Sequence, residues 1–517
     1  MKKMNNILFL EPMLLETYSD QQILTEVLLT WPVYLENYLK SKIDNLNYDL
    51  LYLPDEKKKN KISIKSYSES EEFAKQMSNL LDSVEFEIDQ NTYILLSGTT
   101  SYYYLSIKLI AEYFQKYHPE AIVILGGAHA SACPQDFAFK NSGIDYIFIG
   151  EGERVLYEAI KQEYSKQKHP KKIIGKPILD LDKLPSLDLS ILNKYIPFYK
   201  SLSICLSRGC PFNCSFCQEQ QIHKFYNIKK RWRAYSPQRA IEESKRLIEH
   251  AEIFNIKEIG YVDATFGASR AWLNKFLELW DFNSSVSAVW TETRFDILNE
   301  RHLKSLKDKG FFIWYGLESM SPRMLNIMNK QINPIAYVDK YKRIIKKHVE
   351  LDYVAMSNVI FGHPGETKES YEESFKGLKR IKKEDKNDII QFSLRYFHYF
   401  PGNFVFNNIQ HYMKTYGTKI FYPYWWKDES LLHYGPYMVN SSRDLNIYQL
   451  IENFSEDYEE LGNMAIENLK KTRPADMLPK IMFKKRENKL FKQLGSELLE
   501  FIDSRKDIFP KNTAAKT

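Results

Sequence analysis

The sequence has few cysteines, no long apolar run and no strong excess of one charge. Its 517 residues include only five cysteines, four of them between positions 205 and 217, which is unlike a dispersed disulfide framework. No stretch approaches the roughly 20 apolar residues that span a bilayer. The formal net charge of +6 is too dilute for the basic surface of a nucleic-acid binder. We therefore expect no disulfide scaffold, no membrane and no nucleic acid.

What remains is typical of a large folded protein. Apolar residues make up 44% and charged residues 27% of the chain, which are ordinary values for globular domains. A length of 517 residues predicts about three domains. The segment MKKMNNILFLEPM at the N-terminus has no small-residue cleavage site, so we interpret it as a first strand and expect a cytoplasmic protein.

Residues 1–165 alternate apolar runs with helical patterns. The runs, apolar on both faces as in buried parallel strands, are 6–12, 48–54, 93–100, 121–127 and 145–152. Helical spacing covers 20–42, 103–117 and 153–168. This order predicts a doubly wound, Rossmann-like α/β domain. Its ligand crevice should be formed by the loops at the carboxyl ends of the strands.

Three further segments follow. Residues 166–200 contain prolines and little periodicity, which predicts a surface linker. Residues 201–397 contain six βα repeats, too few for a closed eight-fold barrel, and predict a partial (β/α)6 barrel open on one side. Residues 398–517 predict a small, mostly helical cap with an aromatic-rich start. Those aromatic side chains form either a core under the cap or, together with His398, His411 or His433, part of a substrate pocket.

The clustered cysteines carry the strongest chemical signal. Cys210, Cys214 and Cys217 form a C-x3-C-x2-C triplet after an apolar strand, so three thiolates can converge on one inorganic centre. A zinc site would need a fourth ligand, for which Cys205 and His223 are the nearest candidates. A three-cysteine iron–sulfur cluster instead leaves one iron open to a substrate-like ligand.

This triplet, with the aromatic Phe216 just before its last cysteine, resembles the signature of the radical S-adenosylmethionine superfamily. The resemblance implies a [4Fe-4S] cluster on the three cysteines and S-adenosylmethionine on the open iron. Segments 261–266, 290–296, 316–330 and 358–367 look like the strand ends that line the S-adenosylmethionine site in that family. By that resemblance Glu318 and Ser319 lie beside the cofactor, Glu292 and Arg294 face the cavity floor, and loop 362–366 passes near the adenine. The alternative for each single residue is a structural salt bridge.

The first domain resembles the cobalamin-binding domain that precedes many radical S-adenosylmethionine enzymes. The matching features are Ser97-Gly98-Thr99 at a strand end, the pair Gly126-Gly127, the following His129, and the turn Gly150-Glu151-Gly152-Glu153. Glycines at strand ends let a macrocycle approach the backbone. The Asp-x-His-x-x-Gly motif that supplies a cobalt ligand elsewhere is replaced by Glu-Pro-Met-Leu-Leu-Glu, so cobalamin should lack a protein histidine. The alternative is an α/β domain without a cofactor.

Together these resemblances imply a cobalamin-dependent radical S-adenosylmethionine enzyme, most simply a C-methyltransferase. In that family one S-adenosylmethionine methylates cobalamin, and a second yields the 5'-deoxyadenosyl radical that activates the substrate carbon. We expect a small-molecule or peptide substrate and an electron donor such as flavodoxin or ferredoxin; no catalytic side chain is assigned. The alternatives are a cyclase or ring-rearranging enzyme without net methylation, and a non-catalytic cobalamin or iron–sulfur binding protein.

Overall fold

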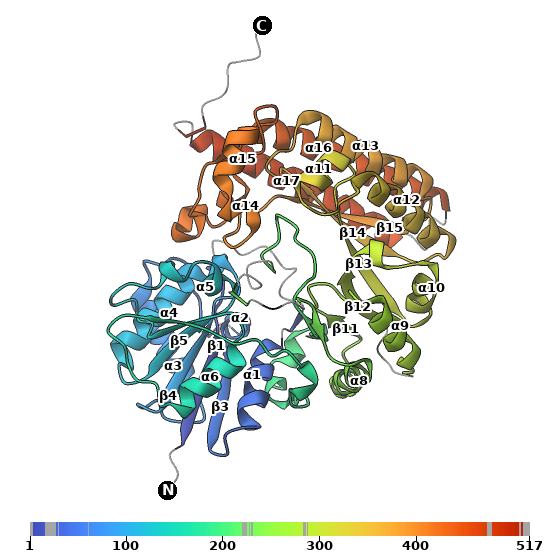
Figure 1. Ribbon diagram of the computed structural model, residues 1–517. Helices are drawn as coiled ribbons and strands as arrows, with labels where there is room; N and C mark the ends of the chain where they lie inside the picture. Colours follow the sequence, from blue (N-terminus) through green and yellow to red (C-terminus); the bar gives the residue numbers. More distant parts are fainter. Residues whose placement is uncertain are drawn as a thin grey trace.

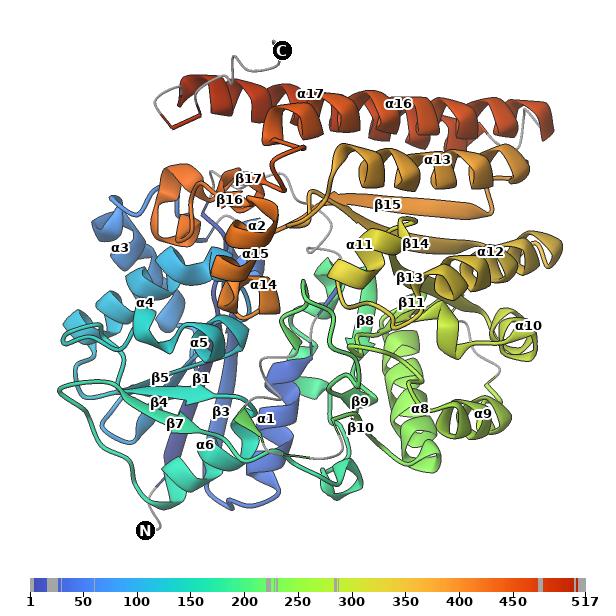
Figure 2. The same cartoon turned by 45° about the horizontal axis from the view of Figure 1, so that its top comes forward.

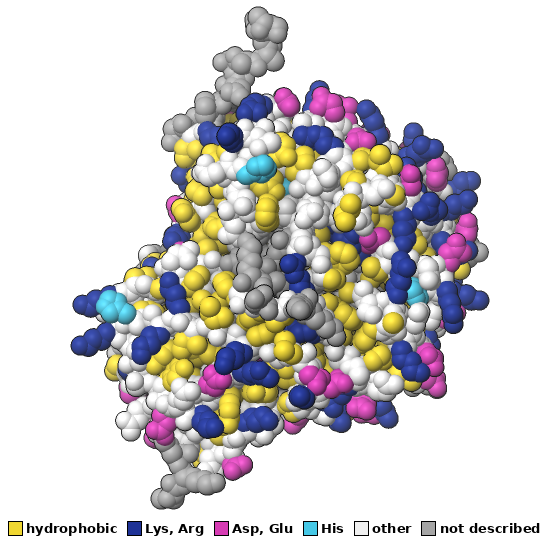
Figure 3. All heavy atoms as spheres, viewed as in Figure 1, with side chains coloured by type: hydrophobic (Ala, Val, Ile, Leu, Met, Phe, Trp, Pro, Cys, Tyr) yellow, Lys and Arg dark blue, Asp and Glu magenta, His cyan; other side chains and the backbone are white. Residues whose placement is uncertain are grey.

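The structure is a computed structural model. It describes residues 4–15, 27–28, 30–59, 61–219, 225–226, 228, 231–282, 286, 288–472, 478–505 and 508–509. In Figure 1 an N-terminal α/β domain, blue to cyan, lies beside a second α/β unit, green to yellow, and the orange and red C-terminal elements lie across the top. Lysine and arginine side chains alternate with acidic ones over the face shown in Figure 3. Within the described residues, no helix combines the length and the apolar character needed to cross a membrane.

The N-terminal domain is built on a parallel sheet of six strands in the order β3-β1-β4-β5-β6-β7. The strands are β1 Asn5–Glu11, β3 Leu46–Tyr52, β4 Thr92–Ser97, β5 Ile122–Gly126, β6 Tyr146–Ile149 and β7 Lys171–Ile174. The main helices are α1 Trp31–Lys40, α2 Leu53–Lys58, α3 Ser70–Leu81, α4 Tyr104–Tyr117, α5 Ala128–Ala132 and α6 Gly152–Lys161. The predicted doubly wound domain is confirmed. Because β3 lies on one side of β1 and β4 on the other, the strand order reverses between β1 and β4, which is where such sheets bind ligands.

The second unit is an open parallel sheet in the order β15-β14-β13-β12-β11-β8-β2. Six strands come from the predicted repeats: β8 Ser201–Ile204, β11 Glu258–Tyr261, β12 Ala288–Thr293, β13 Phe311–Glu318, β14 Ala355–Phe361 and β15 Ile390–Tyr396. The helices are α8 Pro237–Ile253, α9 Arg270–Leu279, α10 Glu300–Asp308, α11 Pro322–Ile327, α12 Pro334–Glu350 and α13 Lys368–Glu384. The predicted partial barrel is therefore confirmed, with a short antiparallel pair, β9 Ser207–Arg208 and β10 Arg233–Ala234, beside it.

The seventh strand was not predicted and comes from the N-terminal segment. β2, Val27–Leu28, pairs with β8, and the hydroxyl of Thr30 donates to the Ser203 carbonyl at 2.6 Å. Within residues 20–42, where the spacing predicted one helix, the described residues give a strand first and a helix only from Trp31. In segment 166–200, predicted to be a linker, β7 extends the first sheet. Both strands are short edge strands, which carry little local sequence signal.

The C-terminal part is mostly helical, as predicted. It contains α14 Phe404–Asn407, α15 Ile409–Tyr416, the small pair β16 Lys419–Ile420 and β17 Val439–Asn440, and two long helices, α16 Ile447–Thr472 and α17 Leu478–Ser504. Figure 2 shows the two long helices lying over α13 and β15. Trp425 and Trp426 are fully buried and pack against the core of the N-terminal domain. These two aromatic residues therefore serve as core, one of the two roles the sequence left open.

Candidate cofactor-binding site

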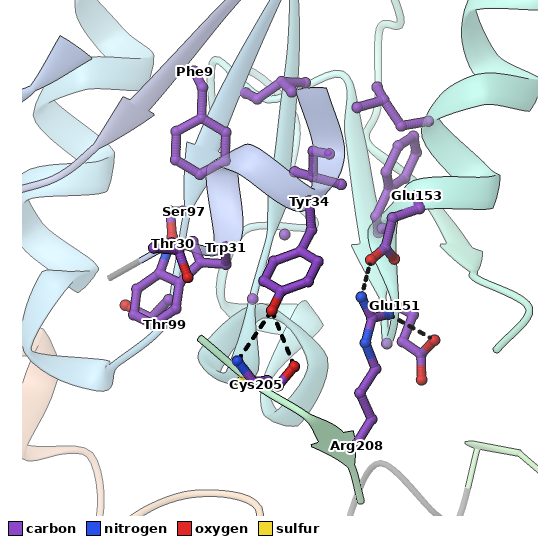
Figure 4. A pocket seen from close by; sticks show the side chains of 18 of the residues that line it. Phe9, Thr30, Trp31, Tyr34, Ser97, Thr99, Glu151, Glu153, Cys205 and Arg208 are labelled. Atoms are coloured by element: carbon purple, nitrogen blue, oxygen red, sulfur yellow. Dashed lines mark hydrogen bonds and ion pairs between the residues drawn. The ribbon is translucent and has the colours of Figure 1, made fainter. Parts of the chain in front are cut away.

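A cavity of about 560 Å³ lies between the N-terminal domain and the start of the barrel. One wall consists of the carboxyl ends of β4, β5 and β6 with helix α1, and the opposite wall consists of β9 and the residues around it. Figure 4 shows Phe9, Trp31 and Tyr34 on one side and Arg208 with Glu151 and Glu153 on the other. The cavity thus opens at the edge where a doubly wound sheet binds its ligand.

The cobalamin-binding residues predicted from the sequence line this cavity, with one exception. The structure brings together Ser97, Thr99, Gly126, Gly127, Gly150 and Glu151. The exception is His129, which does not appear among the described lining residues. Its buried ring lies 2.9 Å from the Ser101 hydroxyl and 3.4 Å from the Asp136 carboxylate. Asp136 in turn accepts from the indole of Trp426 at 2.8 Å, so His129 is placed in the contact with the C-terminal part.

The two adjacent glycines serve different purposes. A Cβ atom on Gly126 would meet nothing within 4 Å, so its missing side chain leaves part of the cavity open. Gly127 has φ +101° and ψ −178°, a conformation open essentially only to glycine. A Cβ there would lie 2.6 Å from the carbonyl of Gly98. Gly126 therefore provides room for a ligand, whereas Gly127 lets two loops approach each other.

Glu151 is the centre of an ion network between the two domains. Its carboxylate lies 3.2 Å from Arg208 and forms a second ion pair with Arg233 at 2.5 Å, and it accepts from the backbone N–H of Ile178 at 3.0 Å. These partners outweigh burial and hold the pKa of Glu151 below its usual value. The neighbouring Glu153 pairs with the same Arg208. Glu151 lines the cavity, but its oxygens are already engaged by protein donors.

Several cavity residues were not predicted from the sequence. The Tyr34 hydroxyl lies 3.0 Å from both the backbone N–H and the carbonyl of Cys205, which ties α1 to the strand leading to the cysteine loop. Arg208 stands only two residues before Cys210. The closeness of Arg208 to the triplet could have marked it as a site residue in the sequence. The contact between Tyr34 and Cys205 spans 171 positions, so no local pattern indicates it.

The three predicted cluster ligands lie in one loop after β9. Cys214 is buried, Cys210 and Cys217 are half-buried, and none of the five cysteines forms a disulfide. Burial, together with the charges of Cys214 and Cys210, raises the pKa of Cys217 to about 12. The three sulfurs therefore lie within electrostatic range of one another. Thiols of this kind become ligands when a metal displaces their protons.

Alternatives to a cluster find little support in this loop. No group of three histidine, cysteine or acidic side chains within the described residues is arranged as a site for a single metal ion. Cys205, a candidate fourth zinc ligand, points its sulfur at the Val262 carbonyl, and His223 lies outside the described residues. In a cubane each cysteine binds a different iron, so the ligands need not surround one point.

Basic side chains lie beside the cysteine loop. Arg294 stacks on the ring of Phe212 at 3.9 Å and donates to Asp296. Lys330 pairs with Glu318 at 3.0 Å in a buried contact and lies near the ring of Phe216. The Nη1 atom of Arg294 is buried and has no hydrogen-bond partner among the described residues. Such an unsatisfied donor is costly unless a ligand accepts from it, and a carboxylate is the natural acceptor.

The remaining predicted residues are two glutamates on neighbouring strands and one serine buried between barrel elements. Glu318 and Glu292 come from neighbouring strands. The Glu292 side chain is exposed, but desolvation by the surrounding protein and the Glu318 charge raise its pKa. Glu318 has φ +72° at a bulge in β13, an uncommon conformation for a non-glycine residue. Ser319 is instead fully buried, and its hydroxyl lies 2.8 Å from that of Ser374 on α13. It packs between elements of the barrel.

Loop 362–366 is attached to the cysteine loop through His363. The Nδ1 atom of His363 donates to the Pro364 carbonyl at 2.8 Å, so Nε2 accepts from the Ser215 hydroxyl at 2.9 Å. Burial lowers the pKa of His363 to about 4, which keeps the ring neutral. Ser215 stands between two of the cysteines, so this contact fixes the cluster loop against the end of β14.

Comparison with known protein families agrees with this geometry. Residues 204–378 match the radical SAM superfamily, and residues 76–160 match the B12 binding domain. The chain therefore contains a B12-binding domain followed by a radical SAM domain, and the predicted cofactor classes are confirmed: a [4Fe-4S] cluster, S-adenosylmethionine and cobalamin.

Three individual proteins illustrate the similarity. An uncharacterized methyltransferase of Pyrococcus horikoshii is 31% identical over 55% of this chain and 63% of its own length. The anaerobic magnesium-protoporphyrin IX monomethyl ester cyclase of Cereibacter sphaeroides is 25% identical over 50% of this chain and 44% of its own length. The radical S-adenosylmethionine methyltransferase TsrM from Kitasatospora setae shares the fold, with a TM-score of 0.55 and 14% identity over 81% of this chain and 77% of its own. The chain thus spans 63% of the length of the first of these curated relatives and 44% of the length of the second.

Proposed function

We propose that the protein is a cobalamin-dependent radical S-adenosylmethionine C-methyltransferase that acts on a small-molecule or peptide precursor. The observation that carries the proposal is the wall shared by the two sites. Arg208 and Gly209 line the cavity at the B12-binding domain, and Cys210, the first predicted cluster ligand, follows directly. A methyl donor and a radical source would therefore adjoin, so that one bound substrate could be reached by both.

The chemical groups of the site residues indicate which cofactor each residue would bind. When bound, the cluster with S-adenosylmethionine supplies a radical that abstracts hydrogen, and cobalamin supplies the methyl group. Arg294 would bind the S-adenosylmethionine carboxylate through its free Nη1 donor, while Asp296 fixes the guanidinium by two hydrogen bonds. The open space at Gly126 would admit part of the cobalamin, and Ser97 and Thr99 would offer hydroxyls to it.

A cyclase or ring-rearranging activity is the second candidate. It is supported by the similarity to the magnesium-protoporphyrin IX monomethyl ester cyclase and would use the same two sites without net methylation. In either case an electron donor such as flavodoxin or ferredoxin would deliver single electrons. We also infer a cytoplasmic location, since cluster assembly needs the three thiols reduced.

The methyltransferase and cyclase activities can be distinguished by an assay that needs no substrate. Anaerobically reconstituted, reduced protein loaded with cobalamin is mixed with S-adenosylmethionine carrying a deuterated methyl group. A methyltransferase should release about one S-adenosylhomocysteine per bound cobalamin and leave the label on the cobalamin, as seen by mass spectrometry. Gly126→Phe should lose this product and Cys133→Ala should keep it. Deoxyadenosine with no S-adenosylhomocysteine would favour the cyclase and contradict the methyltransferase.

A further inference from the structure

Glu11 stands at the carboxyl end of β1, where the strand order of the first sheet reverses. Its side chain is 3% exposed. It accepts from the indole N–H of Trp31 at 3.3 Å and from the hydroxyl of Thr99 at 3.4 Å, and the Ser97 hydroxyl also contacts it. Trp31, Ser97 and Thr99 all line the cavity. Glu11 thus lies directly behind the wall that would face cobalamin.

The carboxyl has no compensating cation. No lysine or arginine of the described residues forms an ion pair with it, and the neighbouring titratable groups are the phenols of Tyr52, Tyr103 and Tyr199, from β3, from the turn after β4 and from the segment before β8. Burial raises the pKa of all three phenols, so they remain neutral at physiological pH. Burial also raises the pKa of Glu11 to about 7, against the three hydrogen bonds that lower it.

The protonation state of Glu11 determines whether the Ser97 and Thr99 hydroxyls can donate hydrogen bonds into the cavity. An ionised carboxylate accepts from both hydroxyls, which then offer only lone pairs to the cavity and face a buried negative charge. A protonated carboxyl accepts from the Trp31 indole, which can only donate, and donates its own O–H to a hydroxyl oxygen. Ser97 or Thr99 is then free to donate into the cavity. Cobalamin carries amide carbonyls and a phosphate, which are acceptors.

We propose that Glu11 is a positioning residue of the cobalamin site. When Glu11 is protonated, it turns the hydroxyl of Ser97 or Thr99 toward cobalamin and so favours binding of the cofactor. This inference rests on the proposed cobalamin occupancy of the cavity. A macrocycle that fills the cavity also excludes water from behind the wall, which further disfavours the carboxylate. Cobalamin binding therefore takes up a proton, and by linkage the affinity falls as the pH rises through the ionisation of free Glu11.

The test measures the dissociation constant of methylcobalamin for the full-length protein between pH 5.5 and 8.5, by absorbance and by quenching of intrinsic fluorescence. Methylcobalamin is the probe because its upper ligand is a methyl group. We expect a constant value below about pH 6.5 and a rise above pH 7, approaching tenfold for each unit by which binding raises the pKa of Glu11.

Two variants separate Glu11 from other titrating groups. Glu11→Gln mimics the protonated acid and should bind at the tight, low-pH value at every pH. The matched control is Glu36→Gln: Glu36 is another buried glutamate with a raised pKa, it pairs with Lys40 on α1, and it should keep the wild-type pH profile. A flat wild-type profile, or a Glu11→Gln profile that still slopes like wild type, would overturn the inference. A flat wild-type profile overturns the inference even if a variant fails to fold. Absence of binding at any pH would overturn the proposed function as well.

Discussion

The adjacent glycines Gly126 and Gly127 allow ligand binding and folding to be tested separately. Alanine at position 127 must adopt φ +101° and ψ −178°, which costs about 1–3 kcal/mol. Its Cβ would also lie 2.6 Å from the Gly98 carbonyl and 2.9 Å from the Thr99 backbone nitrogen, so the two loops must separate. Together these effects predict a loss of at least ~2 kcal/mol, or roughly 4–8 °C in the melting temperature of a domain of 150–250 residues.

Substitution of Gly126 should have the opposite signature. A side chain there enters open space, so Gly126→Phe should leave the melting temperature of the cofactor-free protein nearly unchanged while it fills the cavity. Thermal unfolding followed by circular dichroism gives the first quantity, and the cobalamin absorbance per chain after desalting gives the second. We expect cobalamin content to fall more than tenfold in Gly126→Phe with iron content preserved. Full cobalamin uptake by Gly126→Phe, or an unchanged melting temperature in Gly127→Ala, would refute this reasoning.

Three further predictions follow from other parts of the structure. Cys210→Ala, Cys214→Ala and Cys217→Ala should each abolish S-adenosylmethionine cleavage and lower the iron content from about four per chain, whereas Cys133→Ala, in the N-terminal core, should not; zinc without iron in the wild type would contradict this. His363→Leu removes the hydrogen bond between the Ser215 hydroxyl and the His363 ring, while the contact of Ser215 with the Tyr412 hydroxyl remains. The loss of about 0.5–1.5 kcal/mol should speed iron loss to a chelator; equal rates would count against it. Burial raises the pKa of Glu366 to about 8, above its value in the unfolded chain. The stability of the protein should therefore fall as the pH rises from 4.5 to 8, and Glu366→Gln should flatten the dependence of melting temperature on pH.

The buried strands could be predicted because they carry a strong local pattern. Each of the six barrel strands lies between helical segments, as Phe311–Glu318 does, and this alternation of strand and helix patterns along the chain predicted their order. β2 could not be found in this way. It has two residues and is defined by its pairing with Ser201–Ile204, more than 170 positions away, and such pairing leaves no trace in local composition.

The position of a residue at the candidate site could be predicted where the residue belongs to a motif, and was missed where its position follows from packing. The cysteine triplet and Gly126 belong to motifs. The sequence marked the end of β1 only by the lack of a cobalt-binding histidine, and the burial of Glu11 behind Thr99 depends on helix α1 folding back over the sheet. His129 followed the glycine pair in the motif, yet its ring points to Asp136, because the C-terminal Trp426 occupies that side of the domain.

These long-range contacts indicate that the cofactor cavity is not a property of the B12-binding domain alone. β2 belongs to the barrel sheet, α1 is tied to Cys205 through Tyr34, and the acidic turn of the first domain is neutralised by Arg208 and Arg233 of the second. Removal of the barrel would expose Glu151 without its cations and release the helix that closes the cavity. A fragment that contains only the first sheet should therefore bind cobalamin far more weakly than the whole chain, and the two cofactor sites should form together.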